Sequence, residues 1–273
     1  MEKLQQLAKD IRKQIFKAAY GAQTGHIAPA LSVVEILTSL YFDGILKYDA
    51  KNPAWKERDF FVMSKGHASL ALYAVLAKAK FFSVEELKQF CHGVTPFGGI
   101  LKRNVAYGIE ASTGSLGQGI CFATGVALGM KLDEKKNQVF TVIGDGECQE
   151  GTTWEAAMNA AHHGLDNFTV IIDHNRLQGM DKTENIVREF DLASKWKSFC
   201  FDTIEVDGHD MNALKAAFHK KVKGKPKAIV ANTVKGKGIS FMEGIPIWHY
   251  RMTNKEETKI ALQELDMTEE ELN

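Results

Sequence analysis

The sequence predicts an α/β fold in which a parallel β-sheet is flanked by helices. Helical patterns alternate along the chain with short runs of β-branched and aromatic residues, the order expected when each helix crosses over a sheet. Most of these runs are apolar at nearly every position, as strands are when helices cover both faces of a parallel sheet. The candidate strands are 60–63 (Phe-Phe-Val-Met), 139–143 (Val-Phe-Thr-Val-Ile), 168–172 (Phe-Thr-Val-Ile-Ile), 203–206 (Thr-Ile-Glu-Val) and 228–230 (Ala-Ile-Val).

The first element along the chain is predicted to be an amphipathic helix over residues 1–20, where apolar positions recur at helical spacing among Lys and Arg side chains. We interpret it as a helix of the folded protein rather than a targeting segment. Another helix is predicted over residues 152–161, between two of the strands. Beyond about residue 236 the alternation fades into a less regular C-terminal tail, whose acidic stretch 264–271 predicts a solvated terminal helix or tail.

Composition indicates an ordinary globular protein with a sizeable core. Of the 273 residues, 45% are hydrophobic, and neither a repeat nor a Pro/Gly/Ser linker divides the chain, so 1–273 is predicted to be a single domain. Lys+Arg and Asp+Glu number 34 each, so the net charge is zero and no overall field favours nucleic acid or an anionic membrane. We therefore expect neither as a partner.

The apolar runs and the cysteines of the sequence bear on where in the cell the protein is located. No apolar run reaches the roughly 18 residues that a membrane-spanning helix needs. The four cysteines show no C-x-x-C spacing, and no signal peptide is evident, so they predict free thiols in a reducing cytoplasm.

The residues most informative for chemistry follow two of the predicted strands. Gly-Asp-Gly at 144–146 ends one strand, and Asp-His-Asn at 173–175 ends the next, so Asp145 and Asn175 fall at the sheet edge where ligands bind. A carboxylate and an amide oxygen there can share a hard divalent cation whose shell is completed by diphosphate oxygens. The glycines beside Asp145 let backbone N–H groups approach an anion before the next helix. The unit predicts a metal–diphosphate cradle.

Several motifs of the chain resemble the transketolase family. Gly-Asp-Gly followed after about 30 residues by Asn is similar to the thiamine-diphosphate motif, and residues 144–151 (Gly-Asp-Gly-Glu-Cys-Gln-Glu-Gly) resemble its transketolase form. Four further segments resemble transketolase in the same order: 24–26 (Thr-Gly-His), 63–68 (Met-Ser-Lys-Gly-His-Ala), 113–119 (Thr-Gly-Ser-Leu-Gly-Gln-Gly) and 235–249, which ends in Trp-His. The resemblance extends from about residue 8 to 250 and implies the thiamine-diphosphate-binding (PP-type) fold.

The resemblance also implies cofactors and a role for each matching residue. The implied cofactors are thiamine diphosphate and a divalent ion, Mg²⁺ or Ca²⁺. The implied metal ligands are Asp145, Asn175 and the main-chain carbonyl of Leu177. The implied catalytic residues are His26, His67 and His249. The implied cofactor-binding residues are His67, Gly114, Ser115, Leu116, Asp145, Gly146, Glu150, Asn175 and His249.

The implied activity belongs to carbohydrate metabolism. A two-carbon ketol unit passes from a ketose or ketose phosphate donor to an aldose acceptor, and histidines suit the proton transfers because their pKa lies near working pH. In the family, Gly146 corresponds to a residue whose N–H meets the diphosphate, and His26 to one that contacts sugar hydroxyls. The segment 96–100 (Pro-Phe-Gly-Gly-Ile) departs from the pattern, because Gly99 stands where a substrate histidine is usual. The donor and acceptor sugars therefore stay open.

A larger departure implies a partner chain. The carboxylate that activates the cofactor belongs to a second domain in the family, and nothing after His249 is long enough to supply it. The resemblance implies a second subunit with the pyrimidine-binding and C-terminal domains, in a heterotetramer with two copies of this chain. Glu150 and Glu155 match glutamates near the subunit interface. The apolar residues expected to contribute to the docking face are Ile120, Phe122 and Trp154.

Two other functions stay open at the level of sequence. The chain could serve as the equivalent subunit of another thiamine-diphosphate-dependent decarboxylase or synthase, acting on an unusual sugar or 2-oxo acid. It could instead be a non-catalytic cofactor-binding chain. Five histidines lack any motif and are expected to be structural: His92, His162, His163, His174 and His219.

Overall fold

A parallel five-stranded sheet forms the centre of the protein. The computed structural model describes residues 1–179, 181–188 and 191–272, and the strand order within them is β1-β2-β3-β5-β4. The strands are β1 (Phe60–Met63), β2 (Val139–Gly144), β3 (Phe168–His174), β4 (Asp202–Asp207) and β5 (Lys227–Asn232). Each begins and ends within two residues of the predicted bounds. The predicted fold class, a parallel sheet flanked by helices, is confirmed.

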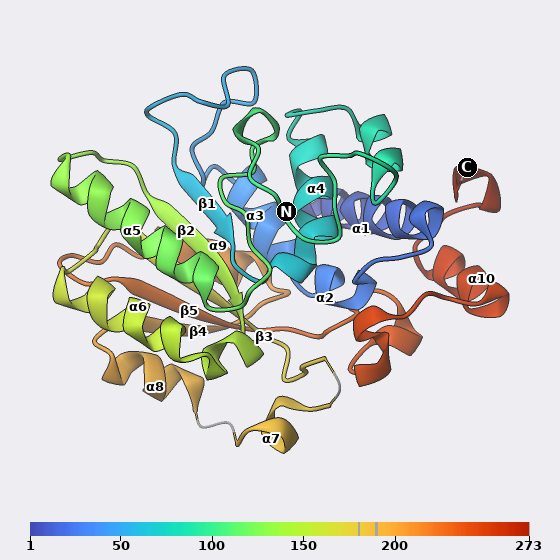
Figure 1. Ribbon diagram of the computed structural model, residues 1–273. Helices are drawn as coiled ribbons and strands as arrows, with labels where there is room; N and C mark the ends of the chain where they lie inside the picture. The colour runs from blue at the N-terminus through green and yellow to red at the C-terminus, as the bar shows by residue number, and fades with distance from the viewer. Residues whose placement is uncertain (180, 189–190, 273) are drawn as a thin grey trace.

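Helices cover both faces of this sheet. Figure 1 shows α5, α6 and α8 together on one face, with α1, α3, α4 and α9 on the other. The helices are α1 (Glu2–Ala22), α2 (Ile27–Leu31), α3 (Val34–Phe42), α4 (Ser69–Lys78), α5 (Gln118–Leu132), α6 (Gly151–His162), α7 (Thr183–Ile186), α8 (Leu192–Ser198), α9 (Met211–His219) and α10 (Lys255–Glu264). The helices predicted at 1–20 and 152–161 correspond to α1 and α6.

The apolar character of the strands follows from this double cover. Successive residues of β2 point to opposite faces, so Phe140 and Val142 join the apolar cluster beneath α1, α3, α4 and α9. Val139 and Ile143 join the cluster beneath α5, α6 and α8. The edge strand β4 differs, because all its residues are partly or fully exposed, whereas β1 at the other edge is largely buried.

The predicted C-terminal tail is better packed than its acidity suggests. Helix α10 starts with a capping box in which Asn254 and Glu257 exchange hydrogen bonds, and it buries Ala261 and Leu262 in the core. Before α10 the chain makes a short 3₁₀ helix, η6 (Pro246–Tyr250), that packs against α2. In the described part of the chain no helix has both the length and the apolar character required to cross a membrane.

Candidate functional site

The two predicted metal-ligand side chains lie together at the ends of β2 and β3. These strands pair in register, with Gly144 opposite Asp173, so the turns that follow them are neighbours. Asp145 is only 2% exposed, and its carboxylate accepts hydrogen bonds from the backbone N–H groups of Gly146 (2.7 Å) and Arg176. Asn175 accepts from the N–H of Leu177 (3.0 Å) through its amide oxygen. Both oxygen-bearing side chains are therefore held in fixed orientations.

These residues line a cavity of about 220 Å³ at the carboxyl ends of the strands. Asp145, Asn175 and Leu177 form one part of its wall. The other predicted site residues that line it are His67, Gly114, Leu116, Gly146 and His249. The lining also contains residues to which the sequence assigned no role, among them Pro29, Lys65, Glu147, Gln178 and Lys235.

Three histidines from distant parts of the chain meet at this cavity. The ring centroid of His26 lies 5.6 Å from that of His67 and 5.2 Å from that of His249, and the latter two are 5.3 Å apart. Burial, followed by the charge of Lys235, lowers the pKa of His26 to about 4 and that of His249 to about 3. Burial and the charge of Lys65 lower the pKa of His67 well below its usual value. At neutral pH all three rings are uncharged.

Three predicted residues, Ser115, Glu150 and His26, lie outside the cavity wall. Ser115 lines a neighbouring open depression of about 500 Å³, which it shares with Gly98 and Ile100. Glu150 is exposed at the start of α6, and the cavity lining does not include it. His26 is connected to the cavity through its ring contacts with His67 and His249.

Two buried lysines supply positive charge, and the sequence alone did not identify them. Lys65 is 1% exposed and forms an ion pair with the carboxylate of Asp173. Lys235 is 2% exposed and donates to the carbonyl of Gln178 (2.8 Å) and to Nδ1 of His249 (2.9 Å). Burial, then the charge of Lys65, lowers the pKa of Lys235 to about 8. Lysine is mostly exposed in proteins, so complete burial beside a cavity is the signal that distinguishes these two.

Glu147 connects three segments around the cavity. Its buried carboxylate accepts from the hydroxyl of Ser64 and from the N–H groups of Gly117 (2.9 Å) and Gly144 (3.2 Å). Burial raises the pKa of Glu147. The sequence suggested that the N–H groups of Gly144 and Gly146 approach a bound anion. In this structure the N–H of Gly144 donates to Glu147 and that of Gly146 donates to Asp145.

The donor set fits a diphosphate bound through a hard cation. A carboxylate, an amide oxygen and a backbone carbonyl at 145, 175 and 177 are the oxygen ligands that Mg²⁺ and Ca²⁺ prefer. Among the described residues, no group of three or more His, Cys, Asp and Glu side chains could hold a metal ion. A cation here therefore needs backbone and anion oxygens as well. A Cβ on Gly146 would lie 2.9 Å from Cγ of Gln178, so glycine keeps this wall open.

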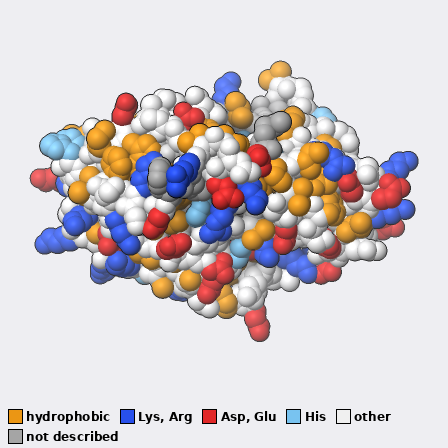
Figure 2. All heavy atoms as spheres, turned by 90° about the horizontal axis from the view of Figure 1, so that it is seen from below, with side chains coloured by type: hydrophobic (Ala, Val, Ile, Leu, Met, Phe, Trp, Pro, Cys, Tyr) orange, Lys and Arg blue, Asp and Glu red, His pale blue; other side chains and the backbone are white. Residues whose placement is uncertain are grey.

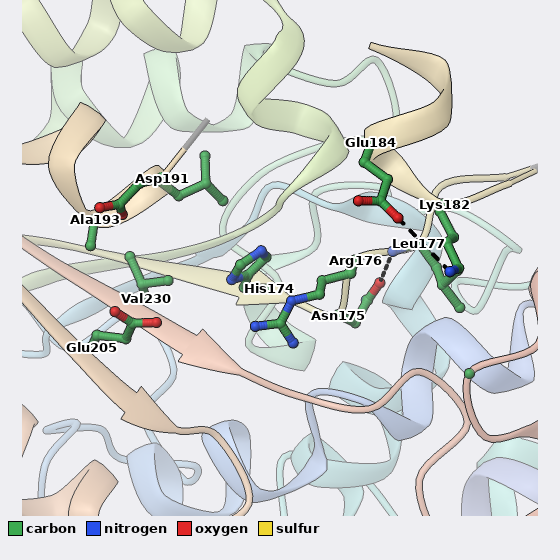
Figure 3. A pocket seen from close by; sticks show the side chains of 12 residues that line it. His174, Asn175, Arg176, Leu177, Lys182, Glu184, Asp191, Ala193, Glu205 and Val230 are labelled. Atoms are coloured by element: carbon green, nitrogen blue, oxygen red, sulfur yellow. Dashed lines mark hydrogen bonds and ion pairs between the residues drawn. The ribbon is translucent and has the colours of Figure 1, made fainter. Parts of the chain in front are cut away.

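A second, larger cavity of about 570 Å³ lies on the other side of the turn 175–177. Asn175 and Leu177 line both cavities, and Figure 3 shows the hydrogen bond between them together with the ion pair of Lys182 and Glu184. His174, which the sequence left without a role, lines only this second cavity. The turn 175–177, which carries two of the predicted metal ligands, thus borders both cavities.

Comparison with known proteins identifies the family. The family model described as "Transketolase, thiamine diphosphate binding domain" matches residues 3–272. The chain belongs to the transketolase family. It is 39% identical over 265 residues to the 6-deoxy-6-sulfo-D-fructose transketolase subunit SqwG of Clostridium sp. (strain MSTE9), covering 96% of each chain. It is 38% identical to one of the subunits of the apulose-4-phosphate transketolase of Actinobacillus succinogenes, covering 97% of this chain and 96% of that one.

Solved structures agree with this assignment. The transketolase of Campylobacter jejuni superimposes with a TM-score of 0.89 at 30% identity, covering 98% of this chain and 43% of the other. This chain therefore spans less than half the length of that transketolase. The predicted transketolase family, its thiamine-diphosphate-binding fold and the class of transferases are confirmed.

Proposed function

We propose that this chain is the thiamine-diphosphate- and metal-binding subunit of a two-subunit transketolase. The enzyme transfers a two-carbon ketol unit from a ketose donor to an aldose acceptor. The observation that carries the proposal is one cavity that combines the oxygen ligands at 145, 175 and 177 with two buried lysines and neutral histidines.

The proposed roles follow from position and charge. Asp145, Asn175 and the carbonyl of Leu177 hold Mg²⁺ or Ca²⁺, and Lys65 and Lys235 balance the charge of the diphosphate. When bound, thiamine diphosphate supplies the carbanion and the electron sink for breaking and making a carbon–carbon bond. Gly146 leaves room for the diphosphate, and the loop of Gly114, Ser115 and Leu116 lies beside the rings of the cofactor.

The histidines bind and orient the sugar in this proposal. His249 accepts a hydrogen bond from Lys235 at Nδ1, so its neutral ring carries the proton at Nε2 and donates from that atom. Neutral rings at His26 and His67 offer one donor and one acceptor each, which suits sugar hydroxyls and proton transfer.

The proposal includes a partner chain, because the carboxylates at the cavity are already engaged. Asp145 accepts two backbone N–H groups, and Glu147 accepts from Ser64, Gly117 and Gly144. In this proposal Asp145 is used to bind the metal and Glu147 to join three segments around the cavity, so neither is assigned to activate the pyrimidine ring. We assign that task to a second subunit with the pyrimidine-binding and C-terminal domains, in a heterotetramer with two copies of this chain. Relatives that are named as transketolase subunits support this assignment.

Exposed apolar side chains around the cavity support the same assignment. Figure 2 shows the molecule from below the view of Figure 1, where hydrophobic patches lie on both sides of a centre at which histidine is visible. Exposed apolar residues lie on segments that also carry lining residues of the two cavities or of the neighbouring depression: Ile100, Ile186, Val187, Ile245 and Ile247. An obligate interface usually buries more than about 2,000 Å², and such residues suit its apolar core.

The expected docking residues on α5 and α6 need a correction. Ile120 is fully buried, and Trp154 packs against Trp196 with ring centroids 5.0 Å apart. Ile120 therefore cannot contribute, because its side chain points from α5 toward the sheet. Trp154 is partly exposed, and Phe122, at 45% exposed, is the most exposed of the three, so these two stay in the proposed docking face.

The test is to assay the purified chain, a candidate partner with the pyrimidine-binding and C-terminal domains, and their mixture for ketol transfer, with light scattering of the mixture. We expect activity only in the mixture, with a mass equal to two copies of each chain. Full turnover by this chain alone would contradict the proposed division of the site. A mixture that binds thiamine diphosphate but transfers no ketol unit from any sugar would contradict the proposed reaction.

The sugar is proposed to differ from the common pentose phosphates. A Cβ on Gly99 would meet nothing closer than the sulfur of Cys91 at 3.7 Å, so packing at the Cβ position does not force a glycine here. The loss of one polar contact costs about 1–3 kcal/mol when its partner is left unsatisfied. A panel of ketoses with and without a terminal phosphate tests this, and best activity on xylulose 5-phosphate would contradict it.

The four cysteines are free thiols, which supports a cytoplasmic place of action.

A further inference from the structure

Tyr250 is an exposed aromatic residue at the edge of the histidine cluster. Its side chain comes from η6 and is 61% exposed, and its ring centroid lies 4.6 Å from that of His26. Its hydroxyl lies 2.7 Å from Oγ1 of Thr24. We propose that Tyr250 and Thr24 form a binding subsite for the hydroxyl-bearing distal carbons of the sugar substrate. This inference rests on the proposed function and adds a specificity determinant to it.

The four rings form a continuous series from the cavity to the surface. His67 and His249 line the cavity, His26 contacts both of them, and Tyr250 contacts His26. A sugar whose carbonyl carbon lies near His67 and His249 therefore extends its remaining carbons along His26 toward Tyr250. The subsite joins two segments that are 226 residues apart in sequence, so no local pattern reveals it.

The pair of hydroxyl groups has unused hydrogen-bonding capacity. Each hydroxyl has one proton and two lone pairs, and the contact between Tyr250 and Thr24 uses one proton and one lone pair. One O–H donor and several acceptor sites remain for a ligand. A half-exposed aromatic ring beside such a pair offers an apolar face to the C–H groups of a sugar and a polar edge to its hydroxyls. This combination fits a polyol chain better than an apolar ligand.

Packing alone does not account for the position of this side chain. Trp248, two residues earlier, is 4% exposed and packs against Phe241 with ring centroids 5.0 Å apart, so the same short helix already has a buried aromatic anchor. Tyr250 instead leaves most of its surface in solvent, and its phenol reaches across to the segment before α2. A side chain exposed in this way contributes little to the core and is available to a ligand.

The experiment uses the assembled enzyme with its partner, thiamine diphosphate and Mg²⁺. Tyr250→Phe removes the hydroxyl and keeps the ring, Tyr250→Ala removes both, and Thr24→Val removes the other hydroxyl. We expect Tyr250→Phe and Thr24→Val each to raise KM for the sugar about three- to tenfold, with little change in kcat. Tyr250→Ala should raise KM further. Tyr107→Phe is the matched control, because that hydroxyl bonds Glu86 away from the cavity.

A second measurement separates failure of this inference from failure of the proposed function. A sugar alcohol such as sorbitol has no carbonyl and cannot react, so its binding to the assembled protein, followed by saturation-transfer NMR, reports the subsite alone. Weaker sorbitol binding by Tyr250→Phe and Thr24→Val would support the subsite even if the enzyme proved to catalyse a reaction other than ketol transfer. Unchanged sorbitol binding and unchanged KM in all three variants would overturn it. Equal losses in the affinity for thiamine diphosphate would overturn it too, since the effect would then lie in the cofactor site.

Discussion

Asn175 donates its side-chain amide to the carboxylate of Asp173, 2.9 Å away and fully shielded from solvent. The same carboxylate accepts from the hydroxyls of Ser32 (2.7 Å) and Thr233 and from the ammonium of Lys65. The amide nitrogen of Asn175 is thereby fixed on Asp173, which leaves its oxygen for the cavity side, where it also accepts from the N–H of Leu177. Asp173 thus determines which atom of Asn175 a cation meets.

Replacing Asp173 by Asn is expected to destabilise the chain by about 3–5 kcal/mol, because Lys65 becomes a buried charge without its partner. Urea denaturation measures the loss. Adding Lys65→Met to this variant should recover part of it, since the uncompensated charge is removed. Asp266→Asn is the control, because Asp266 pairs with Lys9 at the surface and its loss should leave stability nearly unchanged. Equal free energies of unfolding for Asp173→Asn and the wild type would show that the Lys65–Asp173 ion pair does not stabilise the fold.

Replacing Asp145 by Ala is expected to abolish the metal dependence of cofactor binding. The change removes the charged oxygen ligand at the end of β2, while the backbone N–H groups that it engages remain. Calorimetry of the assembled protein with thiamine diphosphate, with and without Mg²⁺, measures the effect. His162→Ala, at an exposed position near the end of α6, is the control. Similar affinities in the two variants would argue against a cation at this turn.

Replacing Gly146 by Ala is expected to weaken diphosphate binding at least tenfold. The added Cβ would lie 2.9 Å from Cγ of Gln178, so Gln178 must move into the cavity or the turn must shift. Gly146 has no positive φ angle, so the fold itself should tolerate alanine. Gly21→Ala is the matched control, because a Cβ there meets nothing within 4 Å and lies in helix α1. The result to look for is a lower affinity with an unchanged melting temperature; unchanged affinity would contradict the role of this glycine.

The sequence predicts those parts of the molecule that depend on local patterns. The apolar runs locate the strands, and the Gly-Asp-Gly turn and Asn175 fall at adjacent strand ends as expected. The buried lysines could not be recognised in this way. The ion-pair partner of Lys65 is a carboxylate 108 residues further along the chain, so no local pattern indicates that Lys65 is buried. The interior position of Ile120 was missed for a related reason: a single apolar residue does not reveal which side of its helix meets the sheet. Contacts between distant segments decide both cases.

The histidine cluster predicts that the chain loses stability as the solution is acidified. The pKa of His249 is lowered from 6.5 to about 3 and that of His26 from 6.5 to about 4, largely by burial. Between these values and 6.5 the unfolded chain binds protons that the folded chain does not. The free energy of unfolding should therefore fall as the pH decreases from about 6.5 toward 4.

Comparing variants separates this contribution from that of the carboxylates, which titrate in part of the same range. His249→Gln removes one depressed group, so its free energy of unfolding should fall less than that of the wild type between neutral pH and about pH 5. Urea denaturation at the two pH values gives the difference. His162→Gln, at an exposed position on α6, should keep the wild-type dependence. If His249→Gln loses as much stability on acidification as the wild type, His249 is not held neutral by the fold, and its proposed role as a donor through Nε2 fails with it.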